Sequence, residues 1–317
     1  MTSPDNKPVI ILLGPTSVGK TGVSILLAKA LKTEIISADS MQIYRHMDIG
    51  TAKPSPDELR EVKHHLIDIL SPGKSFSAGL FRDSAVKLID ELHQKNKIPL
   101  IVGGTGLYIR TLTAGLFEGP SADWKLRDEL LETEHAKGDG YLHSYLEKID
   151  PEAAKKIEPN DVRRIIRALE VSLNDKKISE KQKSHTKPEP YDFIKIGLTR
   201  ERKELYSLID KRVNKMMQDG LLEEVLNLIA LRPDRTAMQA LGYKEMSLYI
   251  AGEVPLEEAV ELIKKRTRNY AKRQMTWFRK EPDINWVDLT GLYDSNTMFE
   301  KILSDIEAIK KIVIKSH

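Results

Sequence analysis

A phosphate-binding loop near the N-terminus is the pattern with the plainest chemistry in this chain. It fits G-x-x-x-x-G-K-[ST] and consists of Gly14, Pro15, Thr16, Ser17, Val18, Gly19, Lys20 and Thr21. The glycines let backbone N–H groups turn toward phosphate oxygens, Lys20 adds a positive charge, and the Thr21 hydroxyl can hold Mg²⁺. The motif is specific only between a strand and a helix. Here it follows the apolar run 8–13 and precedes a helical pattern over 23–31. The sequence therefore predicts a binding site for a di- or triphosphate.

An aspartate, Asp39, follows the second predicted strand about twenty residues after Lys20. In a dinucleotide-binding fold an acid at this offset would hold a ribose, but its partner motif G-x-G-x-x-G is absent. Two interpretations stay open. Asp39 is either a base or metal partner that faces the phosphate loop, or the N-cap of a helix, a position that Asp favours.

The acid that positions the metal ion in many phosphate-loop NTPases has no clear counterpart here. The apolar run 98–102 ends in Gly103–Gly106 rather than in Asp, and Asp68, inside a short apolar run, would be a partial substitute. This pattern weakens the case for an ATP-driven motor or a GTPase and leaves small-molecule kinases open.

Positive charge gathers in two stretches of a chain that is almost neutral overall, with 50 basic and 47 acidic residues. In the stretch 161–170, the three- and four-residue spacings of Arg163, Arg164 and Arg167 predict one helix face. The stretch 264–280 holds eight basic residues and no acid. Lys264, Arg268 and Lys272 form a row that repels itself unless counter-charge is near. Both stretches fit either a local nucleic-acid footprint or a solvated surface.

Aromatic residues are interleaved with the second basic stretch. Tyr270, Trp277 and Phe278 either stack on bases or belong to the core.

Composition excludes several classes of site. The 317 residues include no cysteine, which excludes disulfides, zinc–thiolate sites, iron–sulfur clusters and a cysteine nucleophile. No apolar run approaches the roughly 18 residues that span a membrane, and the N-terminus lacks a signal pattern. We expect a soluble, cytoplasmic protein without a membrane partner.

The elements that must position these residues alternate between apolar runs and helical patterns. Such alternation predicts an α/β fold, a parallel sheet flanked by helices as in phosphate-loop NTPases. Ligands bind at the C-terminal strand ends of such sheets, so the loop, Asp39 and Gly103–Gly106 should line one cleft. The predicted strands are 9–13, 34–37, 65–70, 98–103 and 193–198, with a helix over 81–96 and mostly helix after 200.

An all-helical insertion is predicted from 121 to 187. It leaves 1–120 and 188–317 as a core domain with a helical C-terminal part.

Taken in order, the motifs resemble those of the tRNA dimethylallyltransferase family in its bacterial form. The resemblance rests on the phosphate loop together with 37–54, 64–68, 103–108, 160–164, 240–245 and 268–279. It implies transfer of a dimethylallyl group from its diphosphate to N6 of the adenosine 3′ of the anticodon in tRNA. An enzyme that prenylates free adenine nucleotides and a small-molecule kinase are the alternatives.

The resemblance also implies roles for individual residues. Asp39 would be the base, Thr105 would position the amine or the diphosphate, Arg212 would reach the diphosphate, and Mg²⁺ would be the cofactor. It implies tRNA contacts for Asp39, Ser40, Met41, Gln42, Thr105, Arg127, Arg163, Arg164, Ile165, Ile166, Arg167, Gln239, Ala240, Leu241, Gly242, Tyr243, Lys244, Lys272, Arg273, Gln274, Trp277 and Arg279. The insertion domain would share these contacts. Nothing suggests an obligate interface, so we expect a monomer.

Overall fold

A computed structural model describes residues 7–115, 119–120, 122–174, 177–180 and 187–316. The chain divides into two compact units, Met1–Arg110 with Pro190–His317, and Thr111–Glu189. Each unit has its own apolar core. Among the described residues, no helix is both long enough and apolar enough to cross a membrane.

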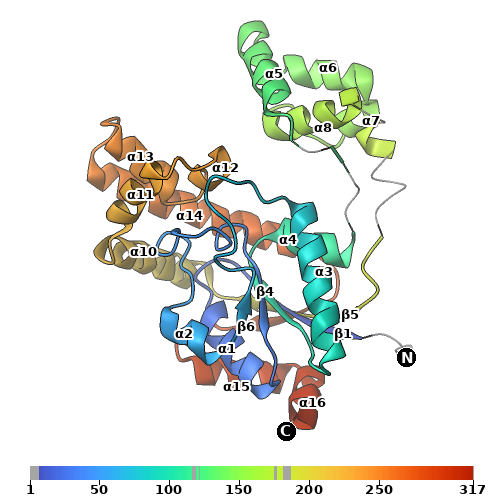
Figure 1. Cartoon of the computed structure of the whole chain (residues 1–317), viewed down its shortest axis with the longest axis vertical. Coiled ribbons are helices and arrows are strands. Elements are labelled where there is room, and N and C mark those ends of the chain that lie inside the picture. Colours follow the sequence, from blue (N-terminus) through green and yellow to red (C-terminus); the bar gives the residue numbers. More distant parts are fainter. Residues whose placement is uncertain (1–6, 116–118, 121, 175–176, 181–186, 317) are drawn as a thin grey trace. The chain divides into compact units, whose positions relative to one another are not determined.

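Six parallel strands form the centre of the larger unit (Figure 1). They run in the order β3-β2-β4-β1-β5-β6. Their bounds are β1 Pro8–Leu13, β2 Ile35–Ala38, β3 His64–His65, β4 Leu100–Gly103, β5 Asp192–Thr199 and β6 Ile284–Asp288. β1 pairs with both β4 and β5, and its residues Val9–Leu13 are fully buried. A strand covered on both faces reads as a continuous apolar run, which is why the sequence revealed it. The α/β prediction is confirmed.

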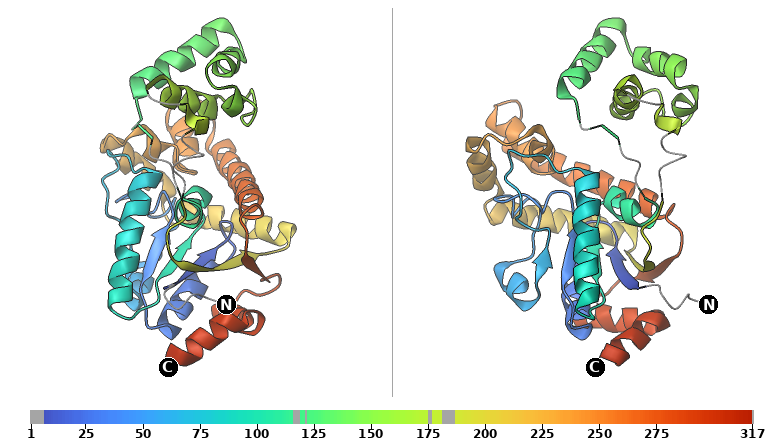
Figure 2. Two further views of the ribbon diagram at one scale, coloured as in Figure 1. Left: turned by 90° about the vertical axis from the view of Figure 1, so that its right-hand side faces the viewer. Right: turned by 45° about the vertical axis from the view of Figure 1, so that its right-hand side comes forward.

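Helices cover both faces of this sheet (Figure 2). α1 (Lys20–Ala30) packs on β1, β2 and β4, and α15 (Ser295–Asp305) packs beside it and on β6. α3 (Ala78–Gln94) packs on β2. Its crossover from β3 to β4 runs opposite to that of α1, and right-handed crossovers place it on the other face. The short helices α2 (Pro56–Glu61) and α4 (Gly106–Thr113) follow β2 and β4, and α16 (Glu307–Ser316) ends the chain.

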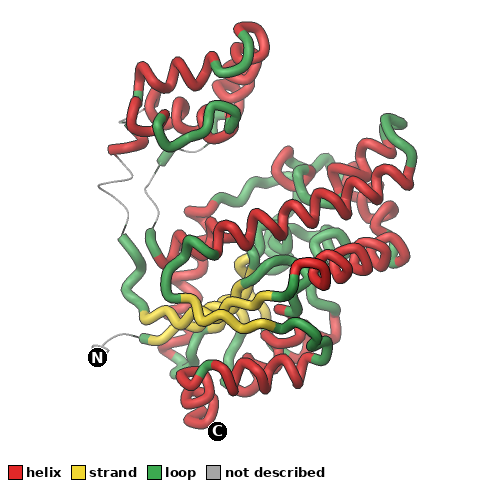
Figure 3. Tube along the Cα trace, turned by 180° about the vertical axis from the view of Figure 1, so that it is seen from behind, coloured by secondary structure: helices red, strands yellow, loops and turns green. Residues whose placement is uncertain are grey.

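A helical layer at one end of the sheet completes the larger unit (Figure 3). Its members are α10 (Arg202–Gln218), α11 (Leu221–Ala230), α12 (Arg235–Met238), α13 (Tyr243–Ile250) and α14 (Leu256–Phe278). They share a core with Ile43, Tyr44 and Met47, which follow β2. α14 packs on α10 and α13, and further along it Ala271 joins the sheet core. α14 thus connects the helical layer to the sheet.

The smaller unit is built from helices. They are α5 (Trp124–Lys137), α6 (Tyr141–Ile149), α7 (Pro151–Ala154) and α8 (Val162–Asn174). α8 presents Ile165, Ala168 and Leu169 to α5 and α6, where they pack on Leu142 and Leu146.

The sequence predictions failed at three elements, of which two were wrong in extent and one strand was missed. The strand predicted over 65–70 ends at His65, because the chain turns at Leu66 and Asp68, where φ is +62° and +55°. β6 was not predicted, since this edge strand is short and its residues Asn285 and Trp286 face solvent. α3 begins at Ala78 rather than 81, where the Ser77 hydroxyl accepts the Leu80 N–H and caps the helix.

Candidate active site

The phosphate loop joins β1 to α1 and bends through two glycines. φ is +155° at Gly14 and +113° at Gly19, a region that other residues rarely adopt. A Cβ at Gly14 would lie 2.8 Å from the carbonyl oxygen of Leu198. Lys20 is the first residue of α1, and the first turn of that helix holds no acidic side chain. Free N–H groups at this helix start therefore face a site suited to an anion.

The Lys20 side chain folds back over its own loop. Its Nζ donates to the carbonyl oxygens of Gly14 (2.9 Å) and Pro15 (2.8 Å). Burial lowers the pKa of Lys20 to about 7; the nearby Asp39 carboxylate opposes this shift and Arg212 adds to it. At neutral pH an amine with this pKa is only partly charged, and an anion such as a diphosphate lying against it would favour the charged form.

Asp39 follows β2 and closes a tight turn. Its Oδ1 accepts the N–H groups of Met41 (2.9 Å) and Gln42 (3.3 Å). The helix N-cap interpretation is wrong, because the next helix, α2, begins only at Pro56 and this oxygen closes a turn instead. Among the described residues the other oxygen accepts no hydrogen bond, and Asp39 lines the cavity beside Lys20. Its role as a base or metal partner stays a prediction.

Thr105 lies beside Asp39 because β2 and β4 are neighbours. The strands approach so closely that a Cβ at Gly103 would lie 2.2 Å from the Ala38 carbonyl oxygen. The Thr105 hydroxyl accepts the Ser40 N–H at 3.1 Å. The two residues predicted to be catalytic are therefore at adjacent strand ends.

Two further side chains fix Thr16 of the phosphate loop. Arg212, on α10, donates through Nη1 to the Thr16 hydroxyl at 3.3 Å. Burial lowers the pKa of Arg212, and the Asp39 carboxylate counteracts the shift. Gln274, on α14, accepts the Thr16 N–H at 2.9 Å and donates to the Gly104 carbonyl oxygen at 2.8 Å. Two cations, Lys20 and Arg212, thus lie with one carboxylate at the loop.

A small, partly open cavity of about 50 Å³ lies at Lys20 and Thr21, where the loop meets α1. Oxygen-bearing side chains that suit a hard cation line it, together with apolar and imidazole groups. Its lining residues are Lys20, Thr21, Ser24, Ile35, Ser37, Asp39, Gln42, Pro54, His64, Ile67, Val102 and Gly103. Within the described ranges, His, Cys, Asp and Glu side chains nowhere gather in threes as a metal site. Any magnesium ion would therefore depend on few protein ligands, with Thr21 among them.

Asp68 has another partner. Its carboxylate pairs with Lys53, whose side chain is 4% exposed and also pairs with Asp48 at 2.6 Å. Lys53 donates to the Tyr44 carbonyl oxygen as well. Asp68 thus helps to close the segment 44–53, and it is absent from the lining of the cavity at the phosphate loop. The structure gives no support to Asp68 as a substitute for the metal-positioning acid.

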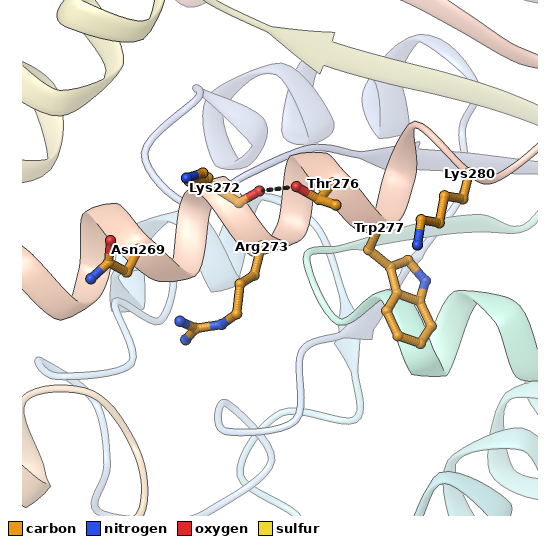
Figure 4. Close-up of a pocket in the computed structure, with 6 residues that line it drawn as sticks. All are labelled: Asn269, Lys272, Arg273, Thr276, Trp277 and Lys280. Carbon is orange, nitrogen blue, oxygen red and sulfur yellow. Dashed lines mark hydrogen bonds between the residues drawn. The ribbon is translucent and has the colours of Figure 1, made fainter. Parts of the chain in front are cut away.

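The C-terminal half of α14 presents an open basic groove (Figure 4). Its lining residues are Asn269, Lys272, Arg273, Thr276, Trp277 and Lys280. Arg273 and Trp277 project from the same side of the helix, and Trp277 is 38% exposed. Arg279 is exposed as well, whereas Gln274 is buried.

The self-repelling row predicted on α14 is largely neutralised. Lys264 pairs with Glu261 at 2.8 Å, and Arg268 pairs with Asp210 at 2.6 Å. Among the described residues Lys272 has no ion pair, so the remaining free charge of this row lies in the groove. Of the aromatic residues, Phe278 is core and Trp277 is partly exposed.

The predicted contacts 239–244 alternate between core and surface. Gln239 and Lys244 are exposed, Leu241 is half-buried, and Ala240, Gly242 and Tyr243 are buried. The Tyr243 hydroxyl donates to Glu224 at 2.6 Å, and that carboxylate also accepts the N–H groups of Asp48, Ile49 and Gly50. The buried members thus hold the segment after β2 in place.

The arginines of the smaller unit surround a buried carboxylate. Glu170 is fully buried and accepts two hydrogen bonds from Arg127, at 2.8 and 2.7 Å, and one from Arg167. Arg167 also donates to the Pro120 carbonyl oxygen at 3.0 Å. The side chain of Arg164 is 67% exposed. Arg163 precedes it on the exposed side of α8.

Two isoleucines predicted to contact tRNA are in the core of this unit. Ile165 and Ile166 are 0% and 7% exposed, so any contact they make with RNA would go through their main chain.

Sequence reasoning missed the acids that hold several of these side chains in place. Glu170 and Glu224 lie in helical patterns, Glu224 directly after Glu223, and nothing in their spacing marks them as the partners of Arg127, Arg167 and Tyr243. Tyr270 was flagged only as core or stacking, yet it lies next to Thr105. Gly104, the second glycine of a Gly-Gly pair, was the one available signal of a close approach there.

Known proteins resemble the whole chain. Residues 42–281 match the family model described as IPP transferase. The chain is 53% identical over 311 residues to the tRNA dimethylallyltransferase of Thermodesulfovibrio yellowstonii, covering 96% of this chain and 98% of that relative. It is 48% identical over 291 residues to that of Geobacter sulfurreducens, covering 90% and 94%.

Solved structures resemble it as well. The full-length tRNA isopentenylpyrophosphate transferase from Bacillus halodurans superposes with a TM-score of 0.68 at 41% identity, covering 99% of this chain and 100% of that one. A eukaryotic dimethylallyltransferase acting on tRNA gives a TM-score of 0.78 at 29% identity, covering 96% and 80%.

Proposed function

This chain belongs to the IPP transferase family, and we propose that it transfers the dimethylallyl group of dimethylallyl diphosphate to tRNA, releasing diphosphate. The acceptor is N6 of the adenosine immediately 3′ of the anticodon. The observation that carries the proposal is the meeting of two cations, Lys20 and Arg212, with the Asp39 carboxylate at a phosphate loop. Such a site holds a diphosphate as a leaving group and offers a base beside it.

The chemical step moves one alkyl group and one proton. The N6 lone pair attacks C1 of the dimethylallyl group, the C1–O bond breaks, and its electron pair leaves with the diphosphate. Asp39 takes the N6 proton through the carboxylate oxygen that does not cap the turn. Proton transfer of this kind contributes about 10²–10⁴-fold. Lys20, Arg212 and the N–H groups at the start of α1 stabilise the charge that develops on the leaving oxygens.

Magnesium fits this site through Thr21. Mg²⁺ prefers oxygen ligands and commonly combines one or two protein ligands with substrate phosphates and water. Thr21 lines the oxygen-rich cavity next to Lys20 and would supply a protein ligand. When bound, the ion would neutralise part of the negative charge of the diphosphate.

The acceptor adenosine must leave its stack to reach this site. We propose that the basic groove on α14, with Lys272, Arg273 and Trp277, holds the RNA backbone and a neighbouring base. Arg163 and Arg164 of the smaller unit would contact the same RNA. The protein would act as a monomer in the cytoplasm, where tRNA is modified.

A transfer assay tests the proposal. Radiolabelled dimethylallyl diphosphate is incubated with the protein, Mg²⁺ and a tRNA whose anticodon is followed by adenosines. Label should enter the tRNA and should be lost when the adenosine 3′ of the anticodon is replaced by guanosine. Incorporation into AMP and not into tRNA would instead favour a nucleotide prenyltransferase. ATP turnover without prenyl transfer would favour a kinase.

A further inference from the structure

One face of α14 touches three consecutive residues between the end of β4 and the start of α4. Tyr270 lies next to Thr105, Gln274 donates to Gly104, and Trp277 packs over Gly106. The helix residues are four and three apart, which is the spacing of one helical stripe. The same stretch of helix carries Lys272 and Arg273 in the basic groove. α14 therefore contacts the loop of Thr105 and presents the groove from the same three turns.

Gln274 extends this contact to the phosphate loop. Its Oε1 accepts the Thr16 N–H at 2.9 Å and its Nε2 donates to the Gly104 carbonyl oxygen at 2.8 Å. The residue is 6% exposed. Both polar atoms of the amide thus have a partner, and the side chain is almost inaccessible to solvent. A direct hydrogen bond from Gln274 to an RNA base is therefore disfavoured. A Cβ at Gly104 would lie 2.4 Å from Nε2, so the glycine is needed for this approach.

From these contacts we propose that Gln274 is a positioning residue that fixes the phosphate loop relative to Thr105. It does so by joining Thr16 to Gly104, a link we name the Gln274 bridge. The inference rests on the proposed function, and it moves Gln274 from the predicted tRNA contacts to the diphosphate site. Thr16 is then held twice, through its N–H by Gln274 and through its hydroxyl by Arg212. Without the bridge, the Thr16 N–H would lose its partner, and of these two contacts only the one from Arg212 would still hold the loop.

The test breaks the bridge from both ends. Q274M keeps the length of the side chain and removes both hydrogen bonds, and G104A forces the amide away with a single methyl group. Binding of inorganic pyrophosphate with Mg²⁺ is measured by calorimetry, and binding of tRNA alone by filter retention. Each single variant should bind pyrophosphate about ten-fold or more weakly, the effect of losing buried hydrogen bonds. Binding of tRNA should stay within about two-fold.

The double variant makes the test specific to the bridge. Both substitutions break the same link, so their effects should not add. Q274M/G104A should therefore bind pyrophosphate about as well as whichever single variant binds it more weakly. K272A, in the groove, is the matched control and should weaken tRNA binding while pyrophosphate binding stays unchanged. If Q274M fails to fold, G104A alone is used to compare the change in pyrophosphate binding with the change in tRNA binding.

Two results would overturn the inference. One is a Q274M protein that loses tRNA affinity and keeps pyrophosphate affinity, which would make Gln274 an RNA contact. The other is a double variant in which the two losses of pyrophosphate affinity add in full, which would show that the two residues do not act through one link. Pyrophosphate binding is measured without any prenyl transfer, so this measurement does not depend on the proposed activity. A wild-type protein that binds pyrophosphate but prenylates no tRNA would therefore contradict the proposed function and leave the bridge measurable.

Discussion

At the scale of residues, the account depends on how two ionisable groups are held. Asp39 uses one oxygen to close the turn after β2, and we propose that the other takes the N6 proton. Burial lowers the pKa of Lys20 to about 7. Each arrangement predicts an effect on catalysis or on ligand binding that a purely structural role of the residue would not produce.

D39N should separate the base from the cap. The amide oxygen can still accept the N–H groups of Met41 and Gln42, so the turn is kept while the basic oxygen is lost. We expect single-turnover prenyl transfer to fall by about 10²–10⁴-fold with tRNA affinity unchanged. D39A, which also removes the two hydrogen bonds that close the turn, should lose roughly a further 1–3 kcal/mol of stability in urea. Wild-type transfer rates in D39N would remove Asp39 from the proton transfer.

Binding of dimethylallyl diphosphate should take up a proton at Lys20. The diphosphate favours the charged ammonium and raises its pKa from about 7. Below pH 7 the Lys20 amine is already charged in the free protein. Binding of the diphosphate therefore takes up a proton only as the pH rises above 7. There affinity should weaken by up to about ten-fold per pH unit.

Calorimetry in two buffers with different ionisation enthalpies at pH 8 measures this proton. K20R is the control, because a guanidinium stays charged and takes up no proton at this position. Equal proton uptake in wild type and K20R would place the titrating group elsewhere.

At the scale of elements, α8 shows how charge serves two purposes on one helix. Arg167 and Arg127 neutralise the buried Glu170, whereas Arg164 extends into solvent. The sequence pattern grouped Arg163, Arg164 and Arg167 on one face, which is correct for a helix. It could not separate them, because their partner Glu170 is identified by packing and not by spacing.

R164A and R167A should therefore differ. R164A should leave stability within about 0.5 kcal/mol and reduce the salt dependence of tRNA binding by about 0.7–0.9 in log–log slope. R167A removes one partner of a buried carboxylate and should cost roughly 1–3 kcal/mol in urea unfolding. Filter binding at several salt concentrations and urea titration measure the two effects. An unchanged salt slope in R164A would indicate a merely solvated face.

The elements themselves could be predicted where they are buried on both sides. β1, β2, β4 and β5 read as apolar runs, and the alternation of such runs with helical patterns predicted a parallel sheet. The order of the strands in that sheet was not predicted. β6 and the true end of β3 could not be predicted from the sequence. β6 exposes Asn285 and Trp286 at the sheet edge, and β3 stops where the chain enters positive φ at Leu66. Such features depend on neighbours far along the chain.

At the scale of the whole molecule, the sequence predicted which residues would approach one another but not what holds them. Parallel topology brings the ends of β1, β2 and β4 together, and with them the phosphate loop, Asp39 and Thr105. The supports, such as Gln274 and Arg212 on Thr16, come from helices more than 190 residues away in the chain. Residue spacing carries no information on such contacts.

The central claim is that the phosphate loop holds a leaving group that departs intact during alkylation of RNA. The most direct measurement is the ratio of N6-prenyladenosine formed in tRNA to pyrophosphate released, in a single turnover with excess protein. We predict one pyrophosphate per prenyladenosine, with no orthophosphate and no requirement for ATP. Release of orthophosphate, or pyrophosphate without a prenylated adenosine, would contradict the account.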